Sequence, residues 1–186
     1  PISVYGKTKL KGEKLIKNFC KKNKINYGIL RYFNVAGASP SGKIGQINKG
    51  DQLFKNLSVE LKKRKPVFKI YGNNYKTNDG TCIRDYVHVV DIAYIHSKVL
   101  KKINSKKSVI LNCGYSKGVS VKEVINTFKK NTKKNIEVKV LKRRKGDMAK
   151  IISDTSKLNK FIKWKPKFNN LNKIVKSCVN WENKNK

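Results

Sequence analysis

Gly28-Ile29-Leu30-Arg31-Tyr32-Phe33 is a short apolar run of the kind that forms a buried β-strand. It follows a segment, about residues 5–22, in which Leu10, Leu15 and Phe19 recur at helical spacing. A helix followed by an apolar strand is half of a parallel α/β unit. The opening of the chain therefore predicts an α/β protein.

The rest of the chain continues the alternation of helices and strands. Ser120 and Glu123 form a capping-box pattern, and Asp91 is expected to cap another helix. Strands are expected at residues 67–71, 82–87, 109–113 and 137–141, and helices near residues 53–64, 91–102, 155–162 and 171–182. The helix capped by Ser120 is expected to carry Val124, Ile125 and Phe128.

The formal charge of +34 points at first to a polyanionic partner such as nucleic acid. The composition argues against a dedicated nucleic-acid reader, because only five of the 45 basic residues are Arg, the residue suited to bidentate phosphate and base contacts. The lysines are also spread along the chain. We expect most of them on solvated faces and no nucleic-acid partner.

Cysteine spacing and hydropathy exclude several further classes. Cys20, Cys82, Cys113 and Cys178 lie far apart with no C-x-x-C pattern, so neither a zinc site nor a disulfide framework is expected. No apolar run reaches the roughly 18 to 20 residues that cross a bilayer. We expect a soluble, cytoplasmic protein without a membrane partner and, because the chain begins at Pro1, the C-terminal portion of a longer one.

Tyr5 and Lys9 are the first candidates for chemistry. Their spacing places a phenol and an ammonium side by side on one helical face. A neighbouring cation favours the phenolate, which suits proton transfer at a sugar hydroxyl. The same pair is also common on solvated helix faces without any function, so the spacing alone leaves both readings open.

A second candidate region follows the strand at residues 28–33. The segment from Arg31 to Ala38 places aromatic and polar residues at the carboxyl end of that strand, where open α/β sheets bind their ligands. Gly37 and Gly42 allow the backbone to approach a ligand closely.

Several segments, in this order and spacing, resemble the UDP-glucose 4-epimerases of the extended short-chain dehydrogenase/reductase group. They cover essentially the whole chain: Tyr5-Gly6-x-x-Lys9, Arg31-Tyr32-Phe33-Asn34-x-Ala36-Gly37-Ala38, Tyr71-Gly72-Asn73-Asn74-Tyr75, Gly80-Thr81-Cys82-Ile83-Arg84-Asp85-Tyr86-Val87-His88-Val89-x-Asp91, Arg143-Arg144-Lys145-Gly146-Asp147 and Trp164-Lys165-Pro166. The resemblance implies the C-terminal part of a Rossmann-like NAD-binding domain with a parallel sheet, plus a smaller α/β substrate-binding domain. The first would comprise residues 1–35 and about 87–114, and the second residues 36–86 and about 115–186.

The resemblance assigns roles around the cofactor NAD. Tyr5 would remove the proton from the sugar 4-hydroxyl while NAD takes the C4 hydride, and the keto sugar would then accept the hydride on its other face. Lys9 would hold the nicotinamide ribose. Phe33 would lie beside the nicotinamide, with ordinary core packing as its alternative. Arg31, Asp85, Tyr86 and His88 are expected mainly to fix loops and the sheet edge.

The resemblance also assigns roles around the UDP-sugar. Asn34 would lie beside the diphosphate, and Arg84 and Arg144 would clamp it with bidentate bonds, with an ion pair between Arg84 and Asp85 as the alternative. Asp147 would accept hydrogen bonds from the uridine ribose, or else cap its loop.

The remaining expected substrate contacts are less direct. Leu53, Ile70 and Tyr71 match the floor under the uracil, although Tyr71 can equally be core. Gln52 stands where related enzymes usually carry Asn or His against the diphosphate, so its longer arm leaves that contact open. Ile151 matches a position that helps to decide whether an N-acetyl group fits, and its intermediate size leaves the hexosamine question open.

The family's glycine-rich phosphate loop is not found in these 186 residues, so we expect this polypeptide alone neither to bind NAD tightly nor to turn over. The leading interpretation is a UDP-glucose 4-epimerase, homodimeric through the helix at residues 5–22. The alternatives are a UDP-pentose, UDP-uronate or UDP-N-acetylhexosamine 4-epimerase and, from another class, a basic nucleic-acid-binding module.

Overall fold

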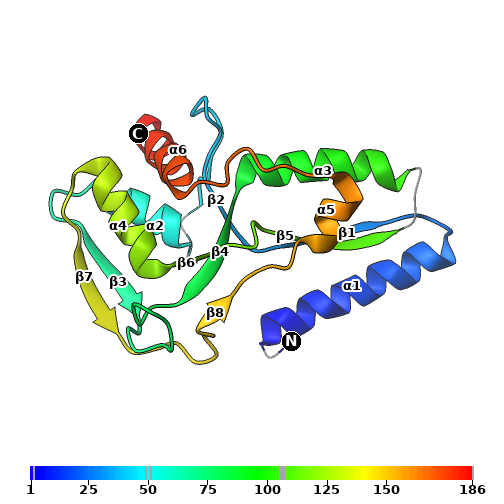
Figure 1. Ribbon diagram of the computed structural model, residues 1–186, viewed down its shortest axis with the longest axis horizontal. Helices are drawn as coiled ribbons and strands as arrows, with labels where there is room; N and C mark the ends of the chain where they lie inside the picture. Colours follow the sequence, from blue (N-terminus) through cyan, green and yellow to red (C-terminus); the bar gives the residue numbers. More distant parts are fainter. Residues whose placement is uncertain (2, 49, 51, 105–107, 186) are drawn as a thin grey trace.

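The computed structural model describes residues 1, 3–48, 50, 52–104 and 108–185, and it has the expected α/β architecture. The described strands form three groups, in which most pairs are parallel, and Figure 1 shows helices packed around them. No helix in the described ranges has the length and apolar character needed to span a membrane.

The first group joins β1 (Gly28–Tyr32) to β5 (Val109–Cys113) in parallel register. In Figure 1, α1 (Val4–Lys22) and α3 (Val89–Ile103) lie on opposite sides of these strands. Arg31 donates to both carboxylate oxygens of Glu13, at 2.7 and 2.6 Å, and so fastens β1 to α1.

The prediction that β1 is a buried strand was wrong for the described structure. Ile29 and Leu30 are only half-buried, and Arg31 and Tyr32 are exposed. The physical reason is that β5 is the one strand paired with β1 among the described residues, so half of the backbone groups of β1 face no neighbouring strand.

The start of α3 also differs from the prediction. His88, not Asp91, is the N-cap, because its Nδ1 accepts a hydrogen bond from the backbone N–H of Val90 at 3.2 Å. The buried Asp91 carboxylate accepts instead from the Tyr115 hydroxyl at 2.6 Å and from the amide of Phe168 at 2.9 Å. Asp91 therefore ties α3 to two distant loops.

The second group is built on β4 (Ile83–His88), whose last half pairs in parallel with β2 (Asn34–Ala36). Its first half pairs with the antiparallel strand β6 (Gly118–Ser120) and, at its start, with the short parallel strand β8 (Lys150–Ile151). β4 consequently connects most of the segments that the sequence marked as functional.

The third group pairs β3 (Val67–Tyr71) with β7 (Glu137–Leu141) in parallel. The helix before β3, α2 (Leu53–Glu60), ends earlier than the expected residue 64. Its last residue, Glu60, accepts a hydrogen bond from the amide of Val67 at 3.0 Å, so the chain has already turned back toward β3.

The remaining helices are α4 (Val121–Thr132), α5 (Ser156–Ile162) and α6 (Leu171–Lys184). α5 and α6 lie close to their predicted bounds, and α4 begins directly after its predicted cap. The capping box at the start of α4 is confirmed. Ser120 Oγ accepts from the amide of Glu123 at 3.0 Å, and the Glu123 carboxylate accepts from the amide of Ser120 at 2.7 Å.

The interior consists of two clusters of buried side chains. One gathers α2, α4 and α6 around residues such as Leu57, Phe128 and Val175. The other packs α3 and α5 on β5, around Ile95 and Leu158. The proposed domain boundaries stay a prediction, and α5 packs with the second cluster.

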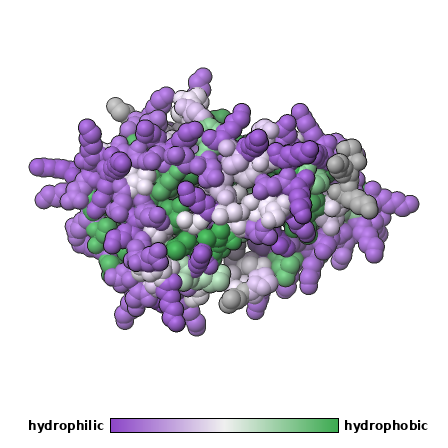
Figure 2. Space-filling model, in the orientation of Figure 1, coloured by the Kyte–Doolittle hydropathy of each residue, from purple (hydrophilic) through white to green (hydrophobic). Residues whose placement is uncertain are grey.

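Hydrophilic side chains project around the whole outline of the molecule, and apolar surface is gathered nearer the middle of the face in Figure 2. Exposed apolar side chains follow α1: Val4, Leu15, Ile16 and Phe19 all keep large exposed fractions, up to 81% for Val4. The four cysteines are free and buried.

Candidate functional site

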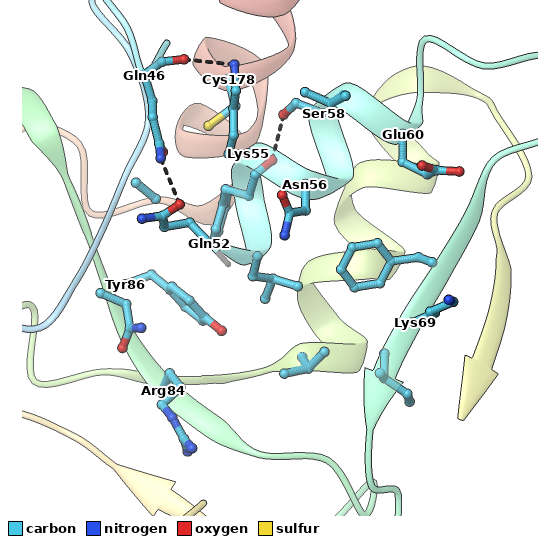
Figure 3. Close-up of a pocket in the computed structure, with 18 of the residues that line it drawn as sticks. Gln46, Gln52, Lys55, Asn56, Ser58, Glu60, Lys69, Arg84, Tyr86 and Cys178 are labelled. Atoms are coloured by element: carbon cyan, nitrogen blue, oxygen red, sulfur yellow. Dashed lines mark hydrogen bonds between the residues drawn. The ribbon is translucent and has the colours of Figure 1, made fainter. Parts of the chain in front are cut away.

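A cavity of about 1110 Å³ lies among α2, β2, β3, β4 and the loop after β7. Figure 3 shows polar side chains from several of these elements facing the same space. Nine of the twelve predicted site residues line it: Phe33, Asn34, Gln52, Leu53, Ile70, Tyr71, Arg84, Arg144 and Asp147. The fold thus brings together residues that lie more than a hundred positions apart.

Asp147 stands between the two arginines. One carboxylate oxygen is 3.8 Å from Arg84 Nη2, and the other accepts a hydrogen bond from Arg144 Nε at 3.0 Å. Arg84 is further held because its Nη1 donates to the carbonyl of Met148 at 2.8 Å. Two guanidinium groups and one carboxylate leave a positive excess, which favours an anionic ligand.

The alternative ion pair between Arg84 and Asp85 is not present. Successive residues of a strand point to opposite faces, so the two side chains diverge. Asp85 is fully buried and accepts from the amides of Tyr115 and Ser116 at 2.9 and 3.0 Å, and it also bonds Ser153. Asp85 fixes loops, as expected.

The end of β3 supplies an open aromatic surface. The Tyr71 side chain is 42% exposed, so the core alternative for it was wrong, and the Arg144 guanidinium lies 4.8 Å from the centre of its ring. Ile70 points the other way into the core. Leu53, the first residue of α2, packs on the edge of the same core.

Tyr86 lines the cavity, although we expected it mainly to support the sheet edge. It is paired in register with Asn34 and lies on the same face of β4 as Arg84. Burial raises the pKa of Tyr86, so its hydroxyl is a neutral donor and acceptor. The sequence indicates this position, because residues two apart in a strand, such as Arg84 and Tyr86, point to the same face of the sheet.

A buried ion pair in the cavity wall was also missed. Lys55 Nζ bonds the carboxylate of Glu182, and the two side chains are only 7% and 6% exposed. Lys62 reaches the other oxygen of the same carboxylate at 3.6 Å. A lysine-rich sequence gave no signal that Lys55, unlike its neighbours, turns inward.

Tyr5 and Lys9 lie side by side on α1, as predicted, with the ammonium 5.3 Å from the centre of the ring. Tyr5 is 72% exposed, and neither residue lines the cavity. Tyr94 and Lys98 on α3 have the same spacing and the same 5.3 Å separation. The local geometry therefore does not distinguish a catalytic pair from an ordinary one.

Ile151 does not line the cavity either, but β8 places it in register with Arg84.

Gly37 packs closely against His88. It has a φ of +91°, and a Cβ there would lie 2.6 Å from the His88 ring, so internal packing is what requires glycine at this position. Burial lowers the pKa of His88 to about 4, against the opposing effect of Asp91. His88 is a neutral structural group, as expected.

A model of the NAD dependent epimerase/dehydratase family matches residues 1–114, more than half of the chain. The chain belongs to this family. It is 37% identical to a UDP-glucose 4-epimerase of Azospirillum brasilense over 98% of its own length and 53% of that protein. It is also 37% identical to UDP-arabinose 4-epimerase 1 of Arabidopsis thaliana, over 98% of the chain and 45% of that protein.

The fold comparison agrees. The UDP-glucose 4-epimerase of Bifidobacterium longum, solved in complex with NAD+ and UDP, superposes with a TM-score of 0.86 at 34% identity, over 97% of this chain and 55% of that one. The resemblance and the α/β class predicted from the sequence are confirmed. The chain spans about half the length of the relatives that it matches.

Proposed function

We propose that this member of the NAD dependent epimerase/dehydratase family contributes to a UDP-glucose 4-epimerase that uses NAD to interconvert UDP-glucose and UDP-galactose. The observation that carries the proposal is the cavity in which Arg84 and Arg144 converge on Asp147, with Asn34 and Tyr71 on adjoining walls. This set fits a nucleoside diphosphate, which needs cations, polar donors and a flat apolar surface.

The arginines would hold the phosphate oxygens, and Asp147 would then turn to the ribose hydroxyls. Tyr71 and the backbone around Ile70 would lie under the base. Arg84 is fixed by the Met148 carbonyl, and the Arg144 side chain, 53% exposed, is held by the Asp147 carboxylate at 3.0 Å.

At the sugar, Tyr5 as phenolate would take the proton of the 4-hydroxyl, and Lys9 would bind the nicotinamide ribose and stabilise the phenolate. The exposed pair on α1 would offer a phenol and an ammonium to the polar edge of the cofactor, and the half-buried Phe33 would offer it an apolar surface. The cofactor held by Lys9 and Phe33 would supply the acceptor for the C4 hydride and the donor that reduces the 4-keto sugar on its other face. The proton then returns from Tyr5 to the new hydroxyl.

A UDP-pentose 4-epimerase is the second candidate. The identity to the Arabidopsis UDP-arabinose 4-epimerase equals that to the Azospirillum enzyme, at 37% each. The contacts proposed here bind the nucleotide and the 4-hydroxyl, which both substrates share.

A homodimer is part of the same proposal, because the exposed Leu15, Ile16 and Phe19 give α1 an apolar face. The cytoplasmic location stays a prediction.

The test is conversion of UDP-galactose, and in parallel UDP-arabinose, by the NAD-supplemented complete enzyme. Tyr5→Phe should abolish most of the turnover, and its matched control is Tyr94→Phe, which has the same lysine geometry. Equal activity of Tyr5→Phe and Tyr94→Phe would show that Tyr5 is not the base. Turnover of neither sugar by the unsubstituted enzyme would refute the proposed function.

A further inference from the structure

Gln52 is held by a second glutamine in the loop before α2. Gln46 Nε2 donates to Gln52 Oε1 at 2.8 Å, and Figure 3 shows the oxygen end of Gln52 facing Gln46. The Gln52 side chain does not cap α2, although Gln52 is the N-cap residue. The Gln52 side-chain amide is therefore not needed to cap the helix and can bind another group.

The orientation of both amides is fixed by one carbonyl. The Gln46 side-chain nitrogen also lies 3.4 Å from the backbone oxygen of Asn48, which can only accept. Because the Asn48 carbonyl needs a donor, the Gln46 side-chain atom that faces it must be the nitrogen Nε2. The Gln52 atom that contacts this nitrogen must then be the acceptor, Oε1. The Gln52 Nε2 is left as the free end, and it donates to no group in the described part of the chain.

The backbone of Gln46 is anchored from two elements. Its carbonyl accepts from Lys55 Nζ at 2.8 Å and from Trp181 Nε1 at 3.0 Å. Lys55 is itself held by its buried ion pair with Glu182. The end of α6 thus fixes the loop from which Gln46 reaches Gln52.

Gly50 leaves the room for this arrangement. A Cβ built on Gly50 would lie 2.5 Å from Gln52 Oε1, so any larger residue there displaces the Gln52 amide. The longer arm of Gln, compared with Asn, is accommodated by folding against this glycine.

We propose that Gln46 is a positioning residue, which holds Gln52 Oε1 so that Gln52 Nε2 donates to a diphosphate oxygen in the cavity. The inference rests on the proposed function. Both glutamines line the same cavity as Arg84 and Arg144, and a phosphate oxygen accepts from an amide nitrogen but not from an amide oxygen. An unrestrained Gln52 presents its oxygen part of the time and repels the anion.

The experiment measures the affinities of UDP and uridine for the complete protein by calorimetry. Gln46→Ala should weaken UDP binding roughly three- to tenfold, the value of one hydrogen bond, and leave uridine binding unchanged. Gln46→Glu should lose more, because a carboxylate attracts Gln52 Nε2 and turns the oxygen toward the phosphates. Gly50→Ala should reproduce the UDP loss without touching Gln46.

A double-variant cycle separates positioning from a general structural role. In a Gln52→Ala background, Gln46→Ala should cause no further loss of UDP affinity. Equal losses in both backgrounds, or an equal loss for uridine, would overturn the inference, as would an unchanged UDP affinity in Gln46→Ala. Failure of the unsubstituted protein to bind UDP would overturn the proposed function and this inference with it. Unfolding midpoints by circular dichroism verify that each variant is folded.

Discussion

Removing one charge of the buried Lys55 and Glu182 pair should destabilise the protein strongly. Both side chains are more than nine-tenths buried. Glu182→Gln keeps the shape but leaves the Lys55 ammonium with neutral acceptors, such as the Gln46 carbonyl, in place of a carboxylate. Breaking a buried pair in this way costs about 3–5 kcal/mol, because one charge stays buried without compensation.

Replacing Lys55 instead of Glu182 should destabilise the protein less. In Lys55→Met the Glu182 carboxylate still has the ammonium of Lys62 at 3.6 Å, and that lysine is 40% exposed. Replacing both residues, as in Lys55→Met with Glu182→Leu, should recover most of the stability, because no charge remains buried. We therefore predict that Glu182→Gln is the least stable variant, that Lys55→Met is more stable, and that the double variant is the most stable of the three.

The assay is urea unfolding followed by circular dichroism. With a slope of about 2 kcal/mol/M, Glu182→Gln should lower the midpoint by about 1.5–2.5 M. The matched control is Glu137→Gln, whose partner Lys139 lies 3.5 Å away in an exposed pair worth less than about 1 kcal/mol. A Glu182→Gln loss no larger than that of Glu137→Gln would refute the assignment of a buried, interdependent pair.

Three further predictions address other parts of the chain. Because burial lowers the pKa of His88 from its usual 6.5 to about 4, its stabilising effect is complete above pH 6.5 and is lost as the pH falls toward 4, on the order of 3 kcal/mol in all; His88→Asn should flatten that part of the pH–stability curve, and an unchanged slope would contradict the assignment. Ser120→Ala should cost about 0.5–2 kcal/mol in urea unfolding through loss of the α4 cap, and a stability equal to wild type would argue against the capping box. Arg84→Lys should weaken UDP binding about tenfold or more, because a lysine cannot make bidentate bonds, whereas Arg64→Lys, outside the cavity, should not change it.

Local sequence patterns predicted the elements well where the deciding interactions are local. The capping box at Ser120, the strand at Val67–Tyr71 and the strand at Glu137–Leu141 appear at the expected residues. Each depends on hydrogen bonds or periodicity within a few residues. The predicted helix cap at Asp91 was wrong, because the Asp91 carboxylate bonds the distant Tyr115 and Phe168, and His88 caps the helix in its place.

Which residues line the cavity depends on contacts between distant parts of the chain, and no local sequence pattern predicts such contacts. Lys55 and Glu182 are 127 positions apart, and nothing in their neighbourhoods separates them from the surface charges. Resemblance to a family supplied Arg84, Arg144 and Asp147, whose convergence is likewise long-range. It did not supply Gln46, because the contact of Gln46 with Gln52 is specific to the loop that carries them.

The two tyrosine and lysine pairs show why geometry within one helix is insufficient evidence for catalysis. Tyr5 with Lys9 and Tyr94 with Lys98 have equal spacing and equal separation, and both tyrosines are exposed. Any difference in reactivity must therefore come from the groups that each helix face meets, not from the pair itself. The ratio of activities of Tyr5→Phe and Tyr94→Phe measures that contribution directly, since each substitution removes one hydroxyl beside a lysine at the same 5.3 Å separation.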